Sequence, residues 1–205
     1  MSDVDVASKQ KTVQQLLGRC LLRLQQYERL LKRLLANHHI EGPAANLACV
    51  LAGRIQSRET RTLGALAKEM FERFVVPTDG RAEKHQDDDA GAALARVNHV
   101  RLLSRVEMSP ERYEAAKAAV NELVDMRNDL VHHLIEMFDT STVDGCLAAR
   151  HHLEDCHRRI DIHLIELRQK AQGMDNARAM SASIMQSEAF IDLFENGIEP
   201  HGTID

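Results

Sequence analysis

The apolar residues between positions 5 and 37 follow the period of an α-helix. They recur mostly at steps of three and four residues, which places them along one side of a helical cylinder. The stripe consists of Val13, Leu16, Leu17, Cys20, Leu21, Leu24, Tyr27, Leu30, Leu31, Leu34 and Leu35. The pattern therefore predicts one long amphipathic helix at the start of the chain.

Two shorter helices are predicted to follow. The Glu-Gly-Pro sequence at 41–43 turns the chain, because glycine and proline both interrupt helices. The pattern then indicates helices over 44–56 and 59–74, the second of them capped by Ser57 or Thr60.

The middle of the chain lacks the helical pattern. Residues 77–91 contain a proline, two glycines and three consecutive aspartates with few apolar residues, which is typical of a loop. Apolar and polar residues alternate over 97–108, so we expect a short β-hairpin there, with a helix as the competing interpretation.

The second half of the chain returns to helix. Ser109, followed by proline and glutamate, is a typical helix start, and this helix is expected to reach about Phe138. Further helices are predicted over 143–172 and, after an interruption at Gly173, over 175–195. The expected fold class is mainly α, a bundle of about five to six helices with the short hairpin in the middle.

We expect a single domain over residues 1–205. It comprises N-terminal helices at 1–75, the polar loop at 77–91, two long helices at 109–172, and a C-terminal helix and tail at 175–205. Hydrophobic residues make up 44% of the sequence and charged residues 28%, which is the balance of a folded globular protein rather than a disordered one.

Composition and charge indicate a cytoplasmic protein that is not a general nucleic-acid binder. The sequence shows neither a secretory signal nor an apolar run of the roughly 20 residues that cross a membrane. Residues 1–75 carry 12 lysines and arginines against 7 acidic residues, whereas 76–205 carry 14 against 24. A basic face on the first helix could contact an RNA backbone, although a solvated helix surface is the simpler interpretation. Its residues are Arg19, Arg23, Arg29, Lys32 and Arg33.

One charged residue interrupts the apolar face of the 109–138 helix. At about 100° per residue, Arg127 falls in the centre of an apolar arc, with Asn128 and His132 together on one edge and His133 on the other. The arc consists of Leu123, Val124, Met126, Leu130, Val131, Leu134, Ile135, Met137 and Phe138.

A buried charge needs a partner, so three interpretations of Arg127 remain open. The arginine forms an ion pair with an acid on a neighbouring helix, lies against a second subunit, or binds an anion together with Asn128 and one histidine. The last two interpretations are compatible with each other.

Arginine and histidine together suit the cleavage of a phosphodiester without a metal ion. Histidine can take a proton from a ribose 2′-hydroxyl or give one to a leaving oxygen, while arginine stabilises the negative charge that develops on phosphate. Two such sets across a two-fold axis would supply both base and acid.

The segment from Arg127 to His132, Arg-Asn-Asp-Leu-Val-His, resembles the Arg-x4–6-His motif of the HEPN superfamily. In that motif a polar residue such as asparagine often follows the arginine, and counting to His133 also gives an allowed spacing. The resemblance covers roughly residues 100–170. It implies a helical, commonly homodimeric, metal-independent ribonuclease of the kind found in toxin–antitoxin, phage-defence and CRISPR systems.

The resemblance also implies roles for individual residues. Arg127 would stabilise the phosphate, His132 or alternatively His133 would act as general acid and base, and Asn128 would orient the histidine or the phosphate. We expect an RNA substrate, an antitoxin or other partner protein, no cofactor or metal, no membrane association and no DNA substrate. The products would be a 2′,3′-cyclic phosphate and a 5′-hydroxyl end.

A second hypothesis makes the chain a non-catalytic HEPN-like helical dimer that binds RNA or a partner protein. Arg127 would then be a structural cation at the subunit interface, satisfied by Asp125 or Glu122 of the other subunit.

Histidines and a cysteine also gather at 151–157, where His152 and Cys156 are four residues apart on the predicted helix. A structural zinc ion needs four ligands, and nothing nearby completes such a set. No metal site is therefore predicted. The four cysteines are expected to be reduced; they are Cys20, Cys49, Cys146 and Cys156.

Overall fold

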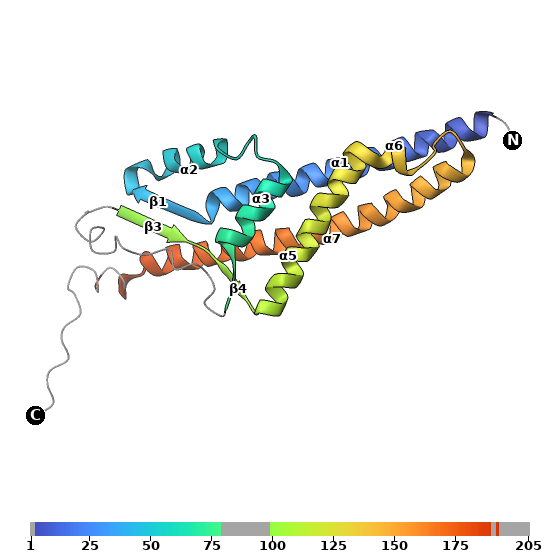
Figure 1. Ribbon diagram of the computed structural model, residues 1–205. Coiled ribbons are helices and arrows are strands. Elements are labelled where there is room, and N and C mark those ends of the chain that lie inside the picture. Colours follow the sequence, from blue (N-terminus) through green and yellow to red (C-terminus); the bar gives the residue numbers. More distant parts are fainter. Residues whose placement is uncertain (1–2, 79–98, 190–191, 193–205) are drawn as a thin grey trace, which may run out of the picture. The chain divides into compact units, whose positions relative to one another are not determined.

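The two longest elements of the computed structural model are α1 (Asp3–Asn37) and α7 (Val143–Met185) (Figure 1). The structure describes residues 3–78, 99–189 and 192. The chain forms two compact units, residues 1–168 and 169–205, and the site and the core described here belong to the first.

Shorter elements connect the two long helices. The first group follows α1 and comprises β1 (His39–Pro43), the 3₁₀ turn η1 (Ala44–Asn46), α2 (Leu47–Gln56), α3 (Leu63–Glu69), the π-helix η2 (Met70–Phe74) and β2 (Val75–Pro77). The second group precedes α7 and comprises β3 (His99–Leu103), β4 (Val106–Met108), α5 (Pro110–Asn128), the π-helix η3 (Asp129–His133) and α6 (Leu134–Met137). The expected mainly-α fold is confirmed.

Within the unit of residues 1–168, α1 and the first part of α7, residues 143–168, run side by side in the same direction (Figure 1). The Cys20 thiol donates a hydrogen bond to the Leu153 carbonyl at 3.4 Å, and further along both helices Arg23 forms an ion pair with Asp161 at 3.1 Å. Residues later in α1 therefore meet residues later in α7.

The core lies between the facing sides of the long helices and α5. The predicted stripe on the first helix is largely confirmed, although Leu16, Leu17, Leu21 and Leu30 are half-buried. Burial of these apolar side chains removes them from water and is the main stabilising contribution of the bundle. The buried residues of these helices are Val13, Cys20, Leu24, Tyr27, Leu31, Leu34, Leu35, Val120, Leu123, Met126, Cys146, Ala149, Leu153, Cys156, Ile160, Leu164 and Leu167.

Strands are present within 97–108, as the alternating pattern predicts, and each pairs with a strand from the first half of the chain. β3 lies antiparallel to β1, with His39 opposite Leu103, and β4 lies parallel to β2, with Val75 opposite Val106. The alternation indicates extended backbone but says nothing about the partner, which depends on contacts far apart in the sequence.

Helix boundaries differ from the predicted ones at the third helix and at Gly173. The third helix begins at Leu63 after a Thr62 cap, whose hydroxyl accepts a hydrogen bond from the Ala65 N–H, so neither Ser57 nor Thr60 is the cap. α7 passes through Gly173 without a break, because a glycine in a helix costs only about 1 kcal/mol relative to alanine.

Two expected segments lie wholly or partly outside the described residues. These are the polar loop at 77–91, of which only residues 77 and 78 are described, and the end of the C-terminal helix and tail. Within the described part of the chain, no helix combines the length and the apolar character needed to cross a bilayer.

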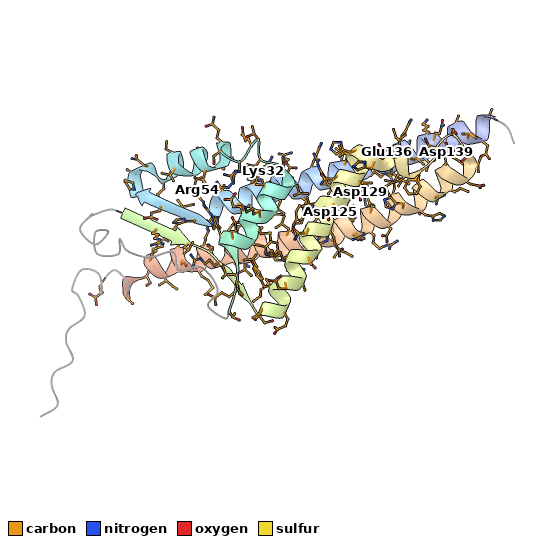
Figure 2. The ribbon with its side chains drawn as sticks, in the orientation of Figure 1. Lys32, Arg54, Asp125, Asp129, Glu136 and Asp139 are labelled. Atoms are coloured by element: carbon orange, nitrogen blue, oxygen red, sulfur yellow. The ribbon has the colours of Figure 1, made fainter. Side chains whose placement is uncertain are left out.

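Side chains close the C-terminal end of α1, where backbone carbonyls have no partner within the helix. Arg54 donates to the Ala36 carbonyl at 2.9 Å and to the Leu35 carbonyl at 3.4 Å (Figure 2). The His38 ring nitrogen Nδ1 lies 2.7 Å from the same Leu35 oxygen. Burial of the ring lowers the pKa of His38 to about 4, so the imidazole is neutral in the folded chain at neutral pH.

Candidate functional site

The segment around Arg127 continues α5 through a π-helix into α6. α5 starts where the sequence predicts, because the Ser109 hydroxyl accepts a hydrogen bond from the Arg112 N–H. At Asp129–His133 the helix widens into η3, and the backbone of His133, with φ −120° and ψ −4°, separates η3 from α6. Single π turns inside longer helices are frequent at functional sites.

Burial changes sharply across this helix. Leu130 and Leu134 are 2% and 6% exposed, whereas Val131 and Ile135 are 44% and 83% exposed. Arg127 is half-buried between these two sides. The uniform helical wheel placed Arg127 in the centre of the apolar arc. Only one side of the arc packs against the core, so Arg127 lies at its border.

The Arg127 guanidinium has a neutral partner in place of a carboxylate. Its Nη1 donates a hydrogen bond to Oδ1 of Asn128 at 3.2 Å. Within the described residues Arg127 is in no ion pair, so the interpretation as an internal ion pair has no support there. Asp125 and Asp129 on either side are exposed and are likewise in no ion pair within those residues (Figure 2).

The two histidines differ in their surroundings, although both are exposed. His133 Nδ1 lies 3.0 Å from Glu136 Oε2, so one of its ring nitrogens is engaged. His132 is in no hydrogen bond within the described part of the chain, and its ring centroid lies 6.2 Å from that of His133. The imidazole of His132 is therefore free to exchange a proton with an external group.

A single copy of the chain brings Arg127 and Asn128 together but does not join them to a histidine. No hydrogen bond among the described residues links Arg127 to His132 or His133. One chain thus supplies a cation that can bind phosphate and an imidazole that can transfer protons, on the same helical segment but, among the described residues, not joined by a hydrogen bond.

Glu122, one of the two acids considered as a partner for Arg127 across an interface, is engaged within the chain. Its Oε2 accepts a hydrogen bond from Arg159 of α7 at 2.8 Å. Of the two candidates, Asp125 is the one without an ion pair among the described residues.

The histidines at 151–157 face separate partners along α7. Cys156 Sγ lies 3.4 Å from His152 Nε2, and His157 pairs with Asp161 at 3.4 Å. Burial raises the pKa of the Cys156 thiol, which favours the protonated form over the thiolate that metals bind. Among the described residues no three ligand side chains gather around a common point.

Sequence reasoning missed a buried ionic cluster next to the end of α2. Arg58 and Glu69, each 5% exposed, form an ion pair, and Arg61 reaches the other Glu69 oxygen at 2.8 Å. Arg58 also donates to the carbonyl of Arg54 at 2.8 Å. These residues come from different elements, and no periodic pattern relates them. Their contacts are internal, so the cluster fixes α3 against α2 and does not form part of the candidate site.

The structure thus places Arg127, Asn128, His132 and His133 on one partly exposed helical segment, as the sequence predicts. Comparison with known proteins does not extend this picture, since no family model, curated protein or solved structure matches the chain.

Proposed function

We propose that the chain is a metal-independent endoribonuclease of HEPN type that acts as a homodimer in the cytoplasm. The observation that carries the proposal is the half-buried Arg127, which is in no ion pair within the described residues. Partial burial strengthens the attraction between a guanidinium and an anion, and phosphate can accept two parallel hydrogen bonds from this group. An RNA phosphate is the anion that the neighbouring histidine could act on.

The proposed reaction uses one imidazole as base and one as acid. A neutral His132 takes the proton of a ribose 2′-hydroxyl, and the 2′-oxygen then forms a bond to the adjacent phosphorus. The bond from phosphorus to the 5′-oxygen breaks, and a protonated His132 from the second copy gives that oxygen its proton. Arg127 stabilises the charge on the remaining phosphate oxygens, and Asn128 holds the guanidinium in place. The products are a 2′,3′-cyclic phosphate and a 5′-hydroxyl end.

The exposed apolar side of the same segment supports association with a second copy. Val131, Ile135 and Met137 are 44%, 83% and 47% exposed, and the exposed His132, His133 and Glu136 lie among them in the sequence. Exposed apolar groups gathered on one segment are typical of interaction surfaces. A two-fold axis at this surface would bring together two sets of Arg127 and His132. A toxin or phage-defence effector controlled by an antitoxin is the biological setting that we propose for such an enzyme.

The test is cleavage of labelled RNA by purified protein in the presence of EDTA. We expect the wild type to cleave, with Arg127→Ala and His132→Ala reduced at least about 100-fold. Arg168→Ala, which removes an exposed arginine in no ion pair among the described residues, is the matched control and should cleave like the wild type. Equal cleavage by all four proteins would refute the assignment of the site.

The alternative function is a non-catalytic HEPN-like dimer that binds RNA or a partner protein. The exposed Asp125, without an ion pair in the described chain, favours it, because this carboxylate could satisfy Arg127 of a second copy. In that case Arg127→Ala and Asp125→Ala would each shift the protein toward monomer in analytical ultracentrifugation, and the wild type would leave RNA intact.

A further inference from the structure

The side of α1 that faces away from the core is basic and contains no acidic residue. Its positions follow steps of three and four residues, opposite the buried stripe, and every one of them is exposed. We call this set the outer stripe of α1. It consists of Lys11, Gln15, Arg19, Leu22, Gln26, Arg29 and Arg33.

The charges of the outer stripe are not neutralised within the described chain. Lys11, Arg19, Arg29 and Arg33 are in no ion pair among the described residues. The same helix does neutralise other cations, since Lys32 pairs with Glu28 at 2.7 Å. Arg23 likewise forms an ion pair with Asp161 of α7 and is therefore not counted in the outer stripe. The stripe therefore presents four positive charges to its surroundings.

The shape of the stripe suits an extended polyanion. From Lys11 to Arg33 it covers 22 residue steps, or about 33 Å of helix, with the cations separated by about 6–15 Å along the axis. Gln15 between them can donate to and accept from sugar and base groups, and Gln26, whose Oε1 accepts a hydrogen bond from Arg23 at 3.0 Å, can still donate. Leu22 is the one large apolar residue of the set, whereas a helix that lies on a membrane needs a continuous apolar face.

The N-terminal part of α1 contacts the loop that follows α6. Next to Lys11, the Gln10 side chain donates a hydrogen bond at 2.9 Å to the carbonyl of Thr140, in the loop that follows α6.

We propose that the outer stripe of α1 binds the phosphate backbone of an RNA strand. The identity of the polyanion as RNA rests on the proposed function, whereas the charge and exposure of the stripe do not. Binding of this kind is independent of base sequence and weakens as salt rises, because cations released from the RNA drive it.

The test measures binding of a fluorescent single-stranded RNA over a series of salt concentrations. All proteins carry Arg127→Ala, so that cleavage does not interfere. The stripe variant adds Arg19→Gln, Arg29→Gln and Arg33→Gln, and glutamine is a good helix former at exposed positions. The control variant loses the same charge elsewhere, at exposed arginines in no ion pair within the described residues. Its substitutions are Arg105→Gln, Arg112→Gln and Arg168→Gln.

The expected result is a loss of affinity and a flatter salt dependence in the stripe variant alone. The slope of log affinity against log salt should fall by about 2, from roughly 0.7 for each lost phosphate contact. The control should keep the slope of its Arg127→Ala parent. Circular dichroism and the melting temperature verify that both variants fold.

The proposal is overturned if the Arg127→Ala protein does not bind RNA, or if both variants lose affinity equally. It is also overturned if the stripe substitutions abolish binding to anionic phospholipid vesicles but not to RNA. Its failure is distinguishable from that of the nuclease. If RNA binding depends on the stripe but the wild type never cleaves RNA, only the proposed nuclease function is refuted. If the wild type cleaves RNA but binding does not depend on the stripe, only the proposed role of the stripe is refuted.

Discussion

Arg127 donates a hydrogen bond to the side chain of its direct neighbour Asn128, and this uncharged amide is its one hydrogen-bond partner among the described residues. Removal of the Arg127 guanidinium therefore leaves no carboxylate buried without a partner. We expect Arg127→Gln to change the free energy of unfolding by no more than about 0.5 kcal/mol. Thermal and urea unfolding measure this. A loss of several kcal/mol would make Arg127 a structural residue.

The Arg58–Glu69 pair is the internal comparison for that experiment. Both side chains are buried, so Glu69→Ala leaves the Arg58 charge without its carboxylate in a medium of low dielectric. We expect a loss of about 3–5 kcal/mol in urea unfolding. The double variant Arg58→Met/Glu69→Leu should recover much of that loss, because no uncompensated charge remains. An unchanged stability in Glu69→Ala would contradict the importance of this pair.

The two histidines of the candidate site should differ in their effect on RNA cleavage. His132 is free to transfer a proton, whereas His133 is held by Glu136. Loss of a general acid–base group typically lowers the rate by about 100- to 10,000-fold, and we expect His132→Ala to fall in this range. His133→Ala and Glu136→Ala should stay within a few-fold of the wild type. The reverse order in single-turnover rates would assign the role to His133.

His38 makes stability depend on pH. Burial lowers its pKa to about 4 in the folded chain, and the unfolded value is about 6.5. Between these values the unfolded chain binds a proton that the folded chain does not. The contribution of His38 to stability is thus complete above pH 6.5 and falls as the pH drops toward 4.

A set of melting curves between pH 4 and pH 7.5 tests this contribution. The melting temperature of His38→Gln should fall less steeply below pH 6.5 than that of the wild type. His39→Gln is the control, since His39 is half-buried and lies 3.1 Å from Glu41. Identical slopes for the wild type and His38→Gln would show that the buried ring does not govern the pH dependence.

Gly145 lies in the first turn of α7, where a side chain has no room. A Cβ atom there would come within 1.9 Å of the Asp139 carbonyl oxygen and within 2.9 Å of the Thr142 hydroxyl oxygen. We expect Gly145→Ala to cost about 1–3 kcal/mol in urea unfolding. At Gly18 in α1 the same atom would meet nothing within 4 Å, so Gly18→Ala should stabilise the chain by up to about 1 kcal/mol. Equal effects would contradict this account of the turn.

The sequence predicts those parts of the fold that depend on local periodicity. The steps of three and four residues identify α1, and the Ser109 cap identifies the start of α5. The pairing of β1 with β3 depends on contacts across some 60 residues, and hydrophobic alternation carries no information about them. The Thr62 cap differs from the predicted one because several nearby hydroxyls fit the same pattern.

The candidate site was predictable to a similar extent. Spacing places Arg127, Asn128 and the histidines on one helical segment. It does not indicate which side of the apolar arc is buried, because that choice depends on how α5 packs against its neighbours. The exposed Ile135 and the border position of Arg127 therefore emerge only from the tertiary structure.

The parallel run of α1 and α7 has a consequence for the newly made polypeptide. Cys20 meets Leu153, so the first helix leaves the ribosome long before the surface that covers it exists. At typical elongation rates the interval is on the order of ten seconds. During translation the apolar face of α1 must therefore be covered by a chaperone or by transient packing of the nascent chain against itself.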